Sequence, residues 1–211
     1  MKKFILRAVA MSSLSAAGLC HATTLSFSAE DGKLYLHPVT FADQGVTFSY
    51  SQKSPSAFAR VGNPVVCTPD CTGNGVEAFY SYNDGTLSFA ATNGASFSLQ
   101  SLQLAQTFLD DRPLDVLITG SLPDGATVSE EIKETTDEDK VFNTFVLPAS
   151  FQGVSEVSIT GVGPNPTSEF AVDGITVSGV SSVPELPSSR LLVAGLAASV
   201  ALSRRRCFAR R

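Results

Sequence analysis

Residues 76–91 read VEAFYSYNDGTLSFAA, two short apolar stretches on either side of Asn83-Asp84-Gly85. Aromatic and small apolar residues bounded by turn residues are typical of β-strands. Asp and Gly tolerate the positive φ angles that a tight β-hairpin needs. The segment therefore predicts two strands, at residues 76–82 and 86–91, joined by a hairpin turn.

The same pattern of short apolar stretches and turn residues continues along the chain. It predicts further strands at residues 24–27, 34–36, 46–50, 57–61, 97–104, 114–120, 126–134, 141–147, 154–160 and 169–177. No stretch between the two ends of the chain has the pattern of a long helix. About a dozen short strands at this spacing predict an all-β, antiparallel β-sandwich of jelly-roll type.

In two of these strands, residues 97–104 and 169–177, the apolar side chains switch half-way between odd-numbered and even-numbered positions. We call this switch a change of parity. Because side chains alternate between the two faces of a strand, each change requires one extra residue, a β-bulge. The breaks fall at Gln100-Ser101 and at Asp173-Gly174, and the glycine would relieve the backbone at the second. Asp173 would then turn outward or ligate a cation.

The N-terminal end carries a targeting signal. Three basic residues within the first seven positions precede a mostly small and apolar run, residues 8–19, and Cys20-His21-Ala22 offers a cleavage site. This is the pattern of a secretory signal peptide. We expect residues 1–22 to be removed on export.

The C-terminal end, residues 183–211, carries a second signal. An uncharged run of 12 residues, 191–202, follows a proline-rich motif and precedes a basic cluster. The run can enter a bilayer while the basic cluster stays on the cytoplasmic side. It gives about 18 Å of helix against a core of about 30 Å, so it forms a transmembrane helix only if its flanks help. A short interfacial or disordered tail is the alternative. The motif comprises Val183, Pro184, Glu185, Leu186 and Pro187, and the cluster comprises Arg204, Arg205 and Arg206.

This tail resembles the sorting signal of PEP-CTERM proteins, which exosortase enzymes process in Gram-negative bacteria that make exopolysaccharide. The family motif is Pro-Glu-Pro, a hydrophobic helix and a basic end. Pro184 and Glu185 match it, Leu186 departs from the third position, and Pro187 follows one residue late.

The remainder of the chain adds to the resemblance. CTPDCTGNG at 67–75, YNDGTLSF at 82–89, SFSLQSLQLAQTF at 96–108 and EFAVDGITVSGV at 169–180 are similar to the β-sandwich body of a PEP-CTERM family. The resemblance implies a precursor anchored in the inner membrane, an exosortase-type partner, and a final place at the cell surface or in an exopolysaccharide biofilm matrix. It implies a structural or adhesive role and carries over no catalytic residue.

The part of the chain between the two signals is strongly acidic. Residues 23–183 contain six lysines and arginines and nineteen aspartates and glutamates, a formal net charge of −13 against −5 for the whole chain. Such a charge repels nucleic acid and anionic lipid surfaces, so we expect no nucleic-acid partner. Polyanionic polysaccharide would need bridging cations or neutral contacts. The length predicts one domain, residues 23–182.

Cys67 and Cys71, in CTPDC, are the cysteines that remain between the two signals. In an exported protein they are predicted to form a disulfide. The closed loop is small, so the entropic stabilisation is about 2 kcal/mol, and Pro69 would help the chain to turn. The alternative is a metal or redox pair. A redox motif prefers two intervening residues, and no second Cys/His pair completes a zinc site.

Few residues point to catalysis. His37 is the only histidine outside the signal peptide, and its neighbour Pro38 suggests a loop. No nucleophile-elbow motif accompanies it. Asp110-Asp111 and Glu130-Glu131 offer paired carboxylates of the kind that a glycosidase uses, yet adjacent residues of a strand face opposite ways. We therefore expect that the protein is not an enzyme, with a glycan-active enzyme as the remote alternative.

Carbohydrate binding is the main alternative function, in the form of a calcium-assisted, lectin-like module. Tyr80 and Tyr82 share one strand face and can stack on a sugar, although cross-strand aromatic packing is the commoner use of such a pair. The chain has no tryptophan, which disfavours a lectin. No cofactor is predicted, with calcium as the alternative, although no loop of recognised spacing is present. Candidate oxygen ligands in turn-like contexts are Glu30, Asp31, Asp70, Asn74 and Asp173.

One acidic stretch, residues 130–140, holds six carboxylates and two lysines. It predicts a solvated hairpin tip whose arms contact the core, through Val128 and Ile132 on one arm and Phe145 and Leu147 on the other. The alternative is a tip that collects divalent cations, because clustered carboxylates repel one another.

Overall fold

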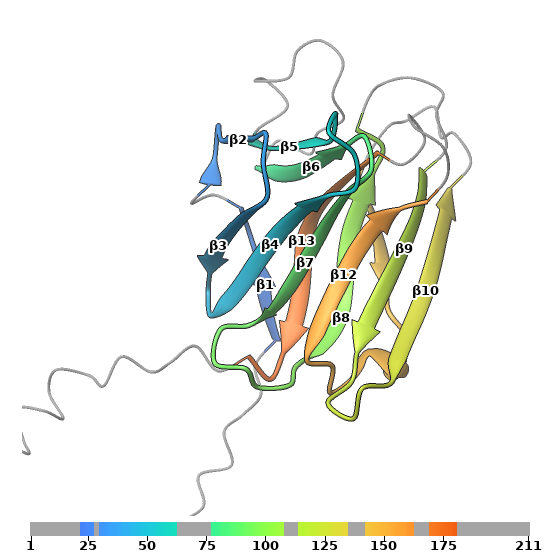
Figure 1. Ribbon diagram of the computed structural model, residues 1–211. Helices are drawn as coiled ribbons and strands as arrows, with labels where there is room; N and C mark the ends of the chain where they lie inside the picture. The colour runs from blue at the N-terminus through green and yellow to red at the C-terminus, as the bar shows by residue number, and fades with distance from the viewer. Residues whose placement is uncertain are drawn as a thin grey trace, which may run out of the picture.

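The computed structural model describes residues 22–27, 30–62, 77–107, 114–134, 142–162 and 169–180, which form two packed antiparallel β-sheets (Figure 1). The first sheet has the strand order β11 (Asn143–Val146), β8 (Ser98–Ala105), β13 (Phe170–Ser178), β6 (Ala78–Tyr82), β5 (Phe58–Gly62) and β2 (Leu34–Tyr35), with β1 (Ala22–Leu25) paired to β13. The second sheet has the order β10 (Thr127–Glu134), β9 (Leu114–Ser121), β12 (Glu156–Gly161), β7 (Gly85–Ala91), β4 (Val46–Gln52) and β3 (Val39–Asp43).

From β6 onward the chain crosses repeatedly from one sheet to the other, which is the connectivity of a jelly roll. The predicted fold class is thereby confirmed. Each predicted strand overlaps an observed one, and β3 was not predicted. Its two apolar side chains, Val39 and Phe41, are only partly buried, so the apolar signal of this edge strand is weak.

The predicted hairpin at Asn83-Asp84-Gly85 is wrong. Asn83 and Asp84 adopt positive φ angles of 55° and 68°, as the turn residues indicate. However, β6 pairs with β5 and β13, whereas β7 pairs with β4 and β12 in the other sheet. The turn therefore carries the chain from one sheet to the other. The prediction failed because local turn geometry does not determine which strands pair.

The predicted hairpin across residues 130–140 is also wrong. β10 pairs with β9 in the second sheet, and β11 pairs with β8 in the first, so this segment connects the sheets. The predicted contacts of its two arms are nevertheless confirmed. Ile132 and Leu147 are buried, and Val128 and Phe145 pack against the core. Residues 135–141, with three of the six carboxylates of the acidic stretch, lie outside the described residues.

Both predicted β-bulges are confirmed, and they offset each other. Between β13 and β8 the register advances from Asp173↔Gln103 to Thr176↔Ser101, which inserts one extra residue in β13. It then advances to Val177↔Leu99, which inserts one in β8 at Gln100. Gly174 has a φ of 54°, so the glycine supplies the positive φ that the first bulge needs. After the second bulge both strands again bury alternate side chains.

The core lies between the sheets and contains a connected chain of phenylalanine rings among aliphatic side chains. Phe48 of β4 is fully buried and its ring lies 5.3 Å from Phe27, 5.2 Å from Phe41 and 5.7 Å from Phe89, measured between centroids. Phe89 continues the chain of rings to Phe97 at 5.8 Å. Phe27 also lies 5.8 Å from Phe79 of β6 in the first sheet, so this chain of rings joins both sheets.

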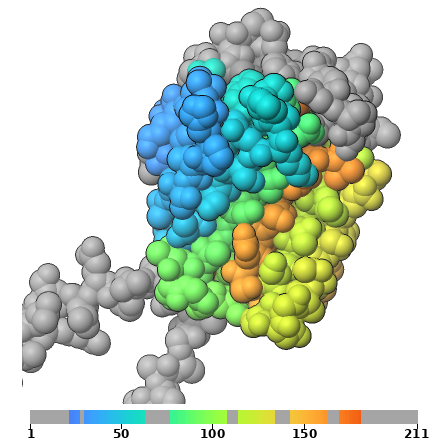
Figure 2. Space-filling view, in the orientation of Figure 1, coloured from blue at the N-terminus to red at the C-terminus, as the bar shows by residue number. Residues whose placement is uncertain are grey.

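The outer face of the second sheet carries short hydroxyl side chains. One row of paired residues crosses all six strands and consists of Thr40, Ser49, Ser88, Ser158, Thr119 and Ser129. Figure 2 shows this face, where segments distant in sequence lie side by side. This polar face against an apolar inner face is the alternation expected of an antiparallel sheet with one side in water.

No helix of the described ranges is long and apolar enough to cross a membrane. The predicted tail helix at residues 191–202 and residues 1–21 of the predicted signal peptide lie outside the described residues, and Ala22, the last residue of that predicted peptide, begins β1. His37 lies in an exposed bend between β2 and β3, as its loop assignment predicts.

Candidate functional site

Two of the predicted ligand-binding residues, Tyr80 and Tyr82, lie on the outer face of the first sheet and are buried, at 1% and 2% exposed. Tyr82 stacks on its cross-strand partner Phe58, with ring centroids 4.3 Å apart and an interplanar angle of 12°. The two tyrosines also share a small apolar cluster with alanines of β6, β8 and β13. Tyr82 therefore takes the packing role rather than that of an exposed sugar platform.

Charged side chains surround this tyrosine pair. Arg60 lies directly across from Tyr80 in the β5–β6 register, and the negative charge of Asp173 acts on Tyr80. Glu169 acts in the same way on Tyr82, and accepts a hydrogen bond from Thr107 Oγ1 at 3.1 Å. Glu169 and Asp173 are themselves buried. The structure thus brings together three predicted site residues, Tyr80, Tyr82 and Asp173.

Burial raises the pKa of Tyr80 to about 12, and Asp173 contributes to the shift. Burial also raises the pKa of Tyr50 to about 12 and the pKa of Tyr82 well above its ordinary value. The pKa of Tyr35 is raised by burial and by its hydrogen bond to Glu30. All four tyrosines of the chain are therefore harder to ionise when folded than when unfolded.

This shift predicts a specific alkaline titration. Because the folded pKa values lie above the ordinary value of 10, the tyrosines contribute stability that is complete below pH 10 and is lost as pH rises toward 12. A spectroscopic titration of the folded protein should show no tyrosinate absorbance until the pH approaches 12. The same protein in denaturant should titrate near 10. The burial of these tyrosines would be contradicted if half of the tyrosinate absorbance of the folded protein appeared near pH 10.

Some of the remaining candidate ligands lie among the described residues and others do not. Asp70 and Asn74 lie outside the described residues, as do Cys67 and Cys71 with their predicted disulfide. Glu30 is engaged by its neighbours, because Lys33 Nζ donates to its Oε2 at 2.8 Å and the Tyr35 hydroxyl donates to the same atom. Within the described ranges, no group of three or more His, Cys, Asp or Glu side chains is placed to hold a metal ion.

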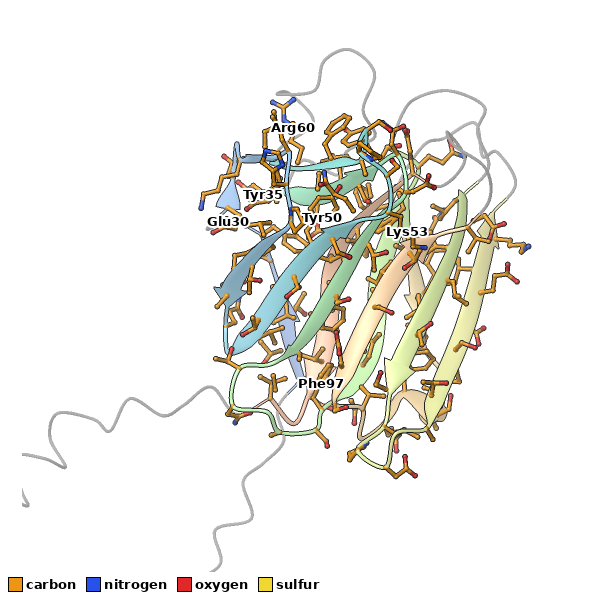
Figure 3. All side chains as sticks on the ribbon, viewed as in Figure 1. Glu30, Tyr35, Tyr50, Lys53, Arg60 and Phe97 are labelled. Carbon is orange, nitrogen blue, oxygen red and sulfur yellow. The ribbon has the colours of Figure 1, made fainter. Side chains whose placement is uncertain are left out.

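A surface cavity of about 570 Å³ lies elsewhere on the first sheet, between β8, β11, the end of β13 and the short 3-10 helix η3 (Ala149–Phe151). Phe97 and Arg60 lie at opposite ends of the sandwich in Figure 3, and the cavity begins at Ser98, next to Phe97. The cavity is therefore distant from Tyr80 and Tyr82 and the residues around them, which we call the tyrosine cluster. Its volume falls in the range of small-ligand sites.

The β8 bulge and η3 build this cavity. Gln100 is the bulged residue, and its carbonyl accepts a 2.8 Å hydrogen bond from the Leu147 amide, which fixes the end of β11. Pro148 caps the following turn, and Phe151 anchors η3 by full burial. Gln100 Nε2 donates to Ser178 Oγ at 3.2 Å, which ties the bulge to β13. Bulges commonly re-aim a side chain in this way.

The cavity-lining residues that the structure describes are all uncharged. Its polar members are two amides and two hydroxyls, Gln100, Gln152, Ser98 and Ser178. Its apolar members are aliphatic, Leu99, Val146, Leu147, Pro148 and Ala149. Val146 is 82% exposed, the highest exposed fraction among the large apolar residues that the structure describes as exposed. Amides and hydroxyls both donate and accept hydrogen bonds, so the site suits a neutral ligand rich in polar groups.

The sequence patterns described above did not predict this cavity. The bulge at Gln100 was predicted from the change of parity. Because a bulge redirects a side chain, it was one available indication of a site here. In NTFVLP, residues 143–148, the apolar residues Phe145, Val146 and Leu147 are consecutive, so one of them has to face water in a strand. That break in alternation is the second available signal.

No family model matches the chain, and no similar curated protein was found. Among solved structures, a cleaved adhesin domain of Lys-gingipain from Porphyromonas gingivalis is 13% identical, with a TM-score of 0.46, and the match covers 74% of this chain and 97% of that one. The CBM22-1 xylan-binding domain from Paenibacillus barcinonensis Xyn10C is 11% identical, with a TM-score of 0.41 and coverage of 78% and 97%. A family 29 carbohydrate-binding module from Piromyces equi is 10% identical, with a TM-score of 0.40 and coverage of 78% and 94%. Likeness at this level assigns no ligand to this chain.

Proposed function

We propose that this protein is a non-catalytic carbohydrate-binding β-sandwich, and that its cavity between β8, β11 and η3 holds a neutral sugar. The observation that carries the proposal is the uncharged lining of that cavity in a domain of net charge −13. A charged ligand would find no opposite charge in the lining, and an anionic one would also meet the repulsion of the whole domain.

The chemistry of the lining supports a sugar in particular. A sugar presents hydroxyl groups around its ring and apolar C–H surface between them. Gln100, Gln152, Ser98 and Ser178 supply hydrogen-bond partners for the hydroxyl groups, and the aliphatic residues supply apolar contact. The exposed Val146 then has a function, since a bound sugar would cover it.

Val146→Asp should abolish binding of neutral oligosaccharides, because it places a charge in the cavity that a bound sugar would desolvate. Val146 is 82% exposed, so the substitution should leave the melting temperature nearly unchanged. Binding is measured by titration calorimetry across a panel of neutral polysaccharide fragments, with and without calcium.

The matched control for this experiment is Leu36→Asp. Leu36 is another large exposed apolar residue, at 58%, and it lies outside the cavity. It should leave binding unaffected. Equal loss of binding in both variants, or no binding by the unaltered chain to any neutral glycan, would refute the proposal. Binding that requires calcium would also contradict a site in this cavity and would favour one that includes acidic residues.

We also infer that the protein is exported and sorted through its C-terminal motif to the cell surface or the exopolysaccharide matrix, where it serves a structural or adhesive role. The support is the sequence of the tail, Val183 to Arg206, and its resemblance to the PEP-CTERM signal. Sugar binding at the cavity would attach the sandwich to that matrix.

Processing by an exosortase-type enzyme predicts that the exported protein ends near Pro184-Glu185 and lacks residues 191–211. Glu185→Ala leaves the apolar run and the arginines intact, so it should spare a simple anchor but make the precursor accumulate in the inner membrane if the motif is recognised. Intact-mass measurement of the exported protein distinguishes the two. Recovery of the full-length C-terminus at the surface of an exosortase-containing cell would defeat the sorting proposal.

A further inference from the structure

Among the described residues, the apolar members of the cavity lining are all aliphatic. Leu99 and Leu147 are buried, at 2% and 8% exposed, while Val146 stands 82% exposed beside them. None of the described lining residues is aromatic, so these residues offer a sugar ring no π-face on which to stack. Apolar stabilisation there comes from contact with aliphatic side chains, which a methyl group of the ligand can make in addition to the C–H surface of the ring.

The polar part of the lining offers amide donors close to that aliphatic surface. Each glutamine amide carries two N–H donors, and Gln100 uses one of them on Ser178 Oγ. Gln152 follows directly after η3, and its side chain is exposed. An acceptor on the ligand can thus be bound by neutral N–H groups beside Val146 and Pro148.

An acetyl group combines these two requirements, since it carries one methyl group and one carbonyl acceptor and no charge. We propose that the cavity selects neutral sugars that carry acetyl groups, with the methyl group packed against Val146 and Pro148 and the carbonyl accepting from Gln100 or Gln152. This inference rests on the proposed function and names the ligand class of the same cavity.

The test uses one polymer in two forms. Glucomannan carrying O-acetyl esters is compared with the same glucomannan after mild alkaline deacetylation, which removes the ester without creating a charge. N-acetyl sugars are a poorer probe, because deacetylation leaves an amine that the acidic domain attracts non-specifically. The full chain should bind the acetylated form at least roughly four-fold more tightly, the effect of removing about one methyl group from water.

Two substitutions on β11 make the test specific to the cavity. Val146→Thr keeps the shape of the side chain but replaces a methyl group by a hydroxyl, so the affinity ratio between the two forms should fall toward one. Thr144→Val is the reverse exchange on the same strand face, outside the cavity lining, and should leave the ratio unchanged.

The possible results separate the two proposals. Binding of both forms with equal affinity by the unaltered chain would overturn the acetyl preference and leave carbohydrate binding intact. Failure to bind either form or any other neutral glycan would refute the proposed function itself. An acetyl preference that survives Val146→Thr but is lost in Thr144→Val would overturn the placement of the methyl group in this cavity.

Discussion

Phe48→Ala is expected to lower the free energy of unfolding by about 4 kcal/mol, which is the cost of removing a large buried side chain and leaving a cavity. Phe48 is fully buried and contacts three other phenylalanines, Phe27, Phe41 and Phe89. Because these rings belong to different parts of the sandwich, the surrounding side chains cannot collapse easily into the space. Equilibrium denaturation in urea measures the change.

The control for this substitution is Leu36→Ala, which also truncates a large apolar side chain. Leu36 is 58% exposed, so its truncation should change the free energy of unfolding by less than about 0.5 kcal/mol. Similar losses in the two variants would mean that Phe48 does not lie in a close-packed core.

Gly85→Ala is expected to destabilise the fold by about 3 kcal/mol, although alanine is normally the milder residue in a strand. A Cβ at position 85 would lie 2.3 Å from Ser81 Oγ and 2.6 Å from Tyr50 Cε2. Tyr50 and Ser81 are both buried, so neither can move aside without disturbing the core. The glycine is required here for close approach of the two sheets at the crossing turn.

Removing one of the two obstacles should rescue part of this loss. Ser81→Ala in the Gly85→Ala background removes the nearer atom, so the double variant should be more stable than Gly85→Ala alone. The Tyr50 ring remains, and the rescue should therefore be incomplete. A Gly85→Ala variant as stable as the unaltered chain would show that the two sheets are farther apart at this point.

The sequence of residues 76–91 explains which features of the fold could be predicted. Turn residues with positive φ were recognisable at Asn83 and Asp84, since that preference is local. The pairing of β6 was not, because all five of its residues are buried and no polar face marks an outer side. A strand that is apolar on both faces can accept several neighbours, so the choice depends on packing elsewhere.

The bulges at Gln100 and Asp173-Gly174 were predictable because parity within one strand depends only on the sequence of that strand. The cavity was not, since residues 98–100, 146–149, 152 and 178 come together only through the pairing of β8 with both β11 and β13. Tyr80 and Tyr82 were correctly placed on one face of their strand. Their burial depends on tertiary packing, which a single strand sequence does not encode.

The most direct test of sugar binding in the cavity is an amide-resolved NMR titration of the exported protein with an acetylated neutral oligosaccharide. We predict saturable shifts at Gln100, Val146 and Gln152, with Tyr80 and Tyr82 at the other end of the sheet unaffected. Shifts confined to the tyrosine cluster, to the hydroxyl row of the second sheet, or absent altogether at saturating ligand would contradict the account.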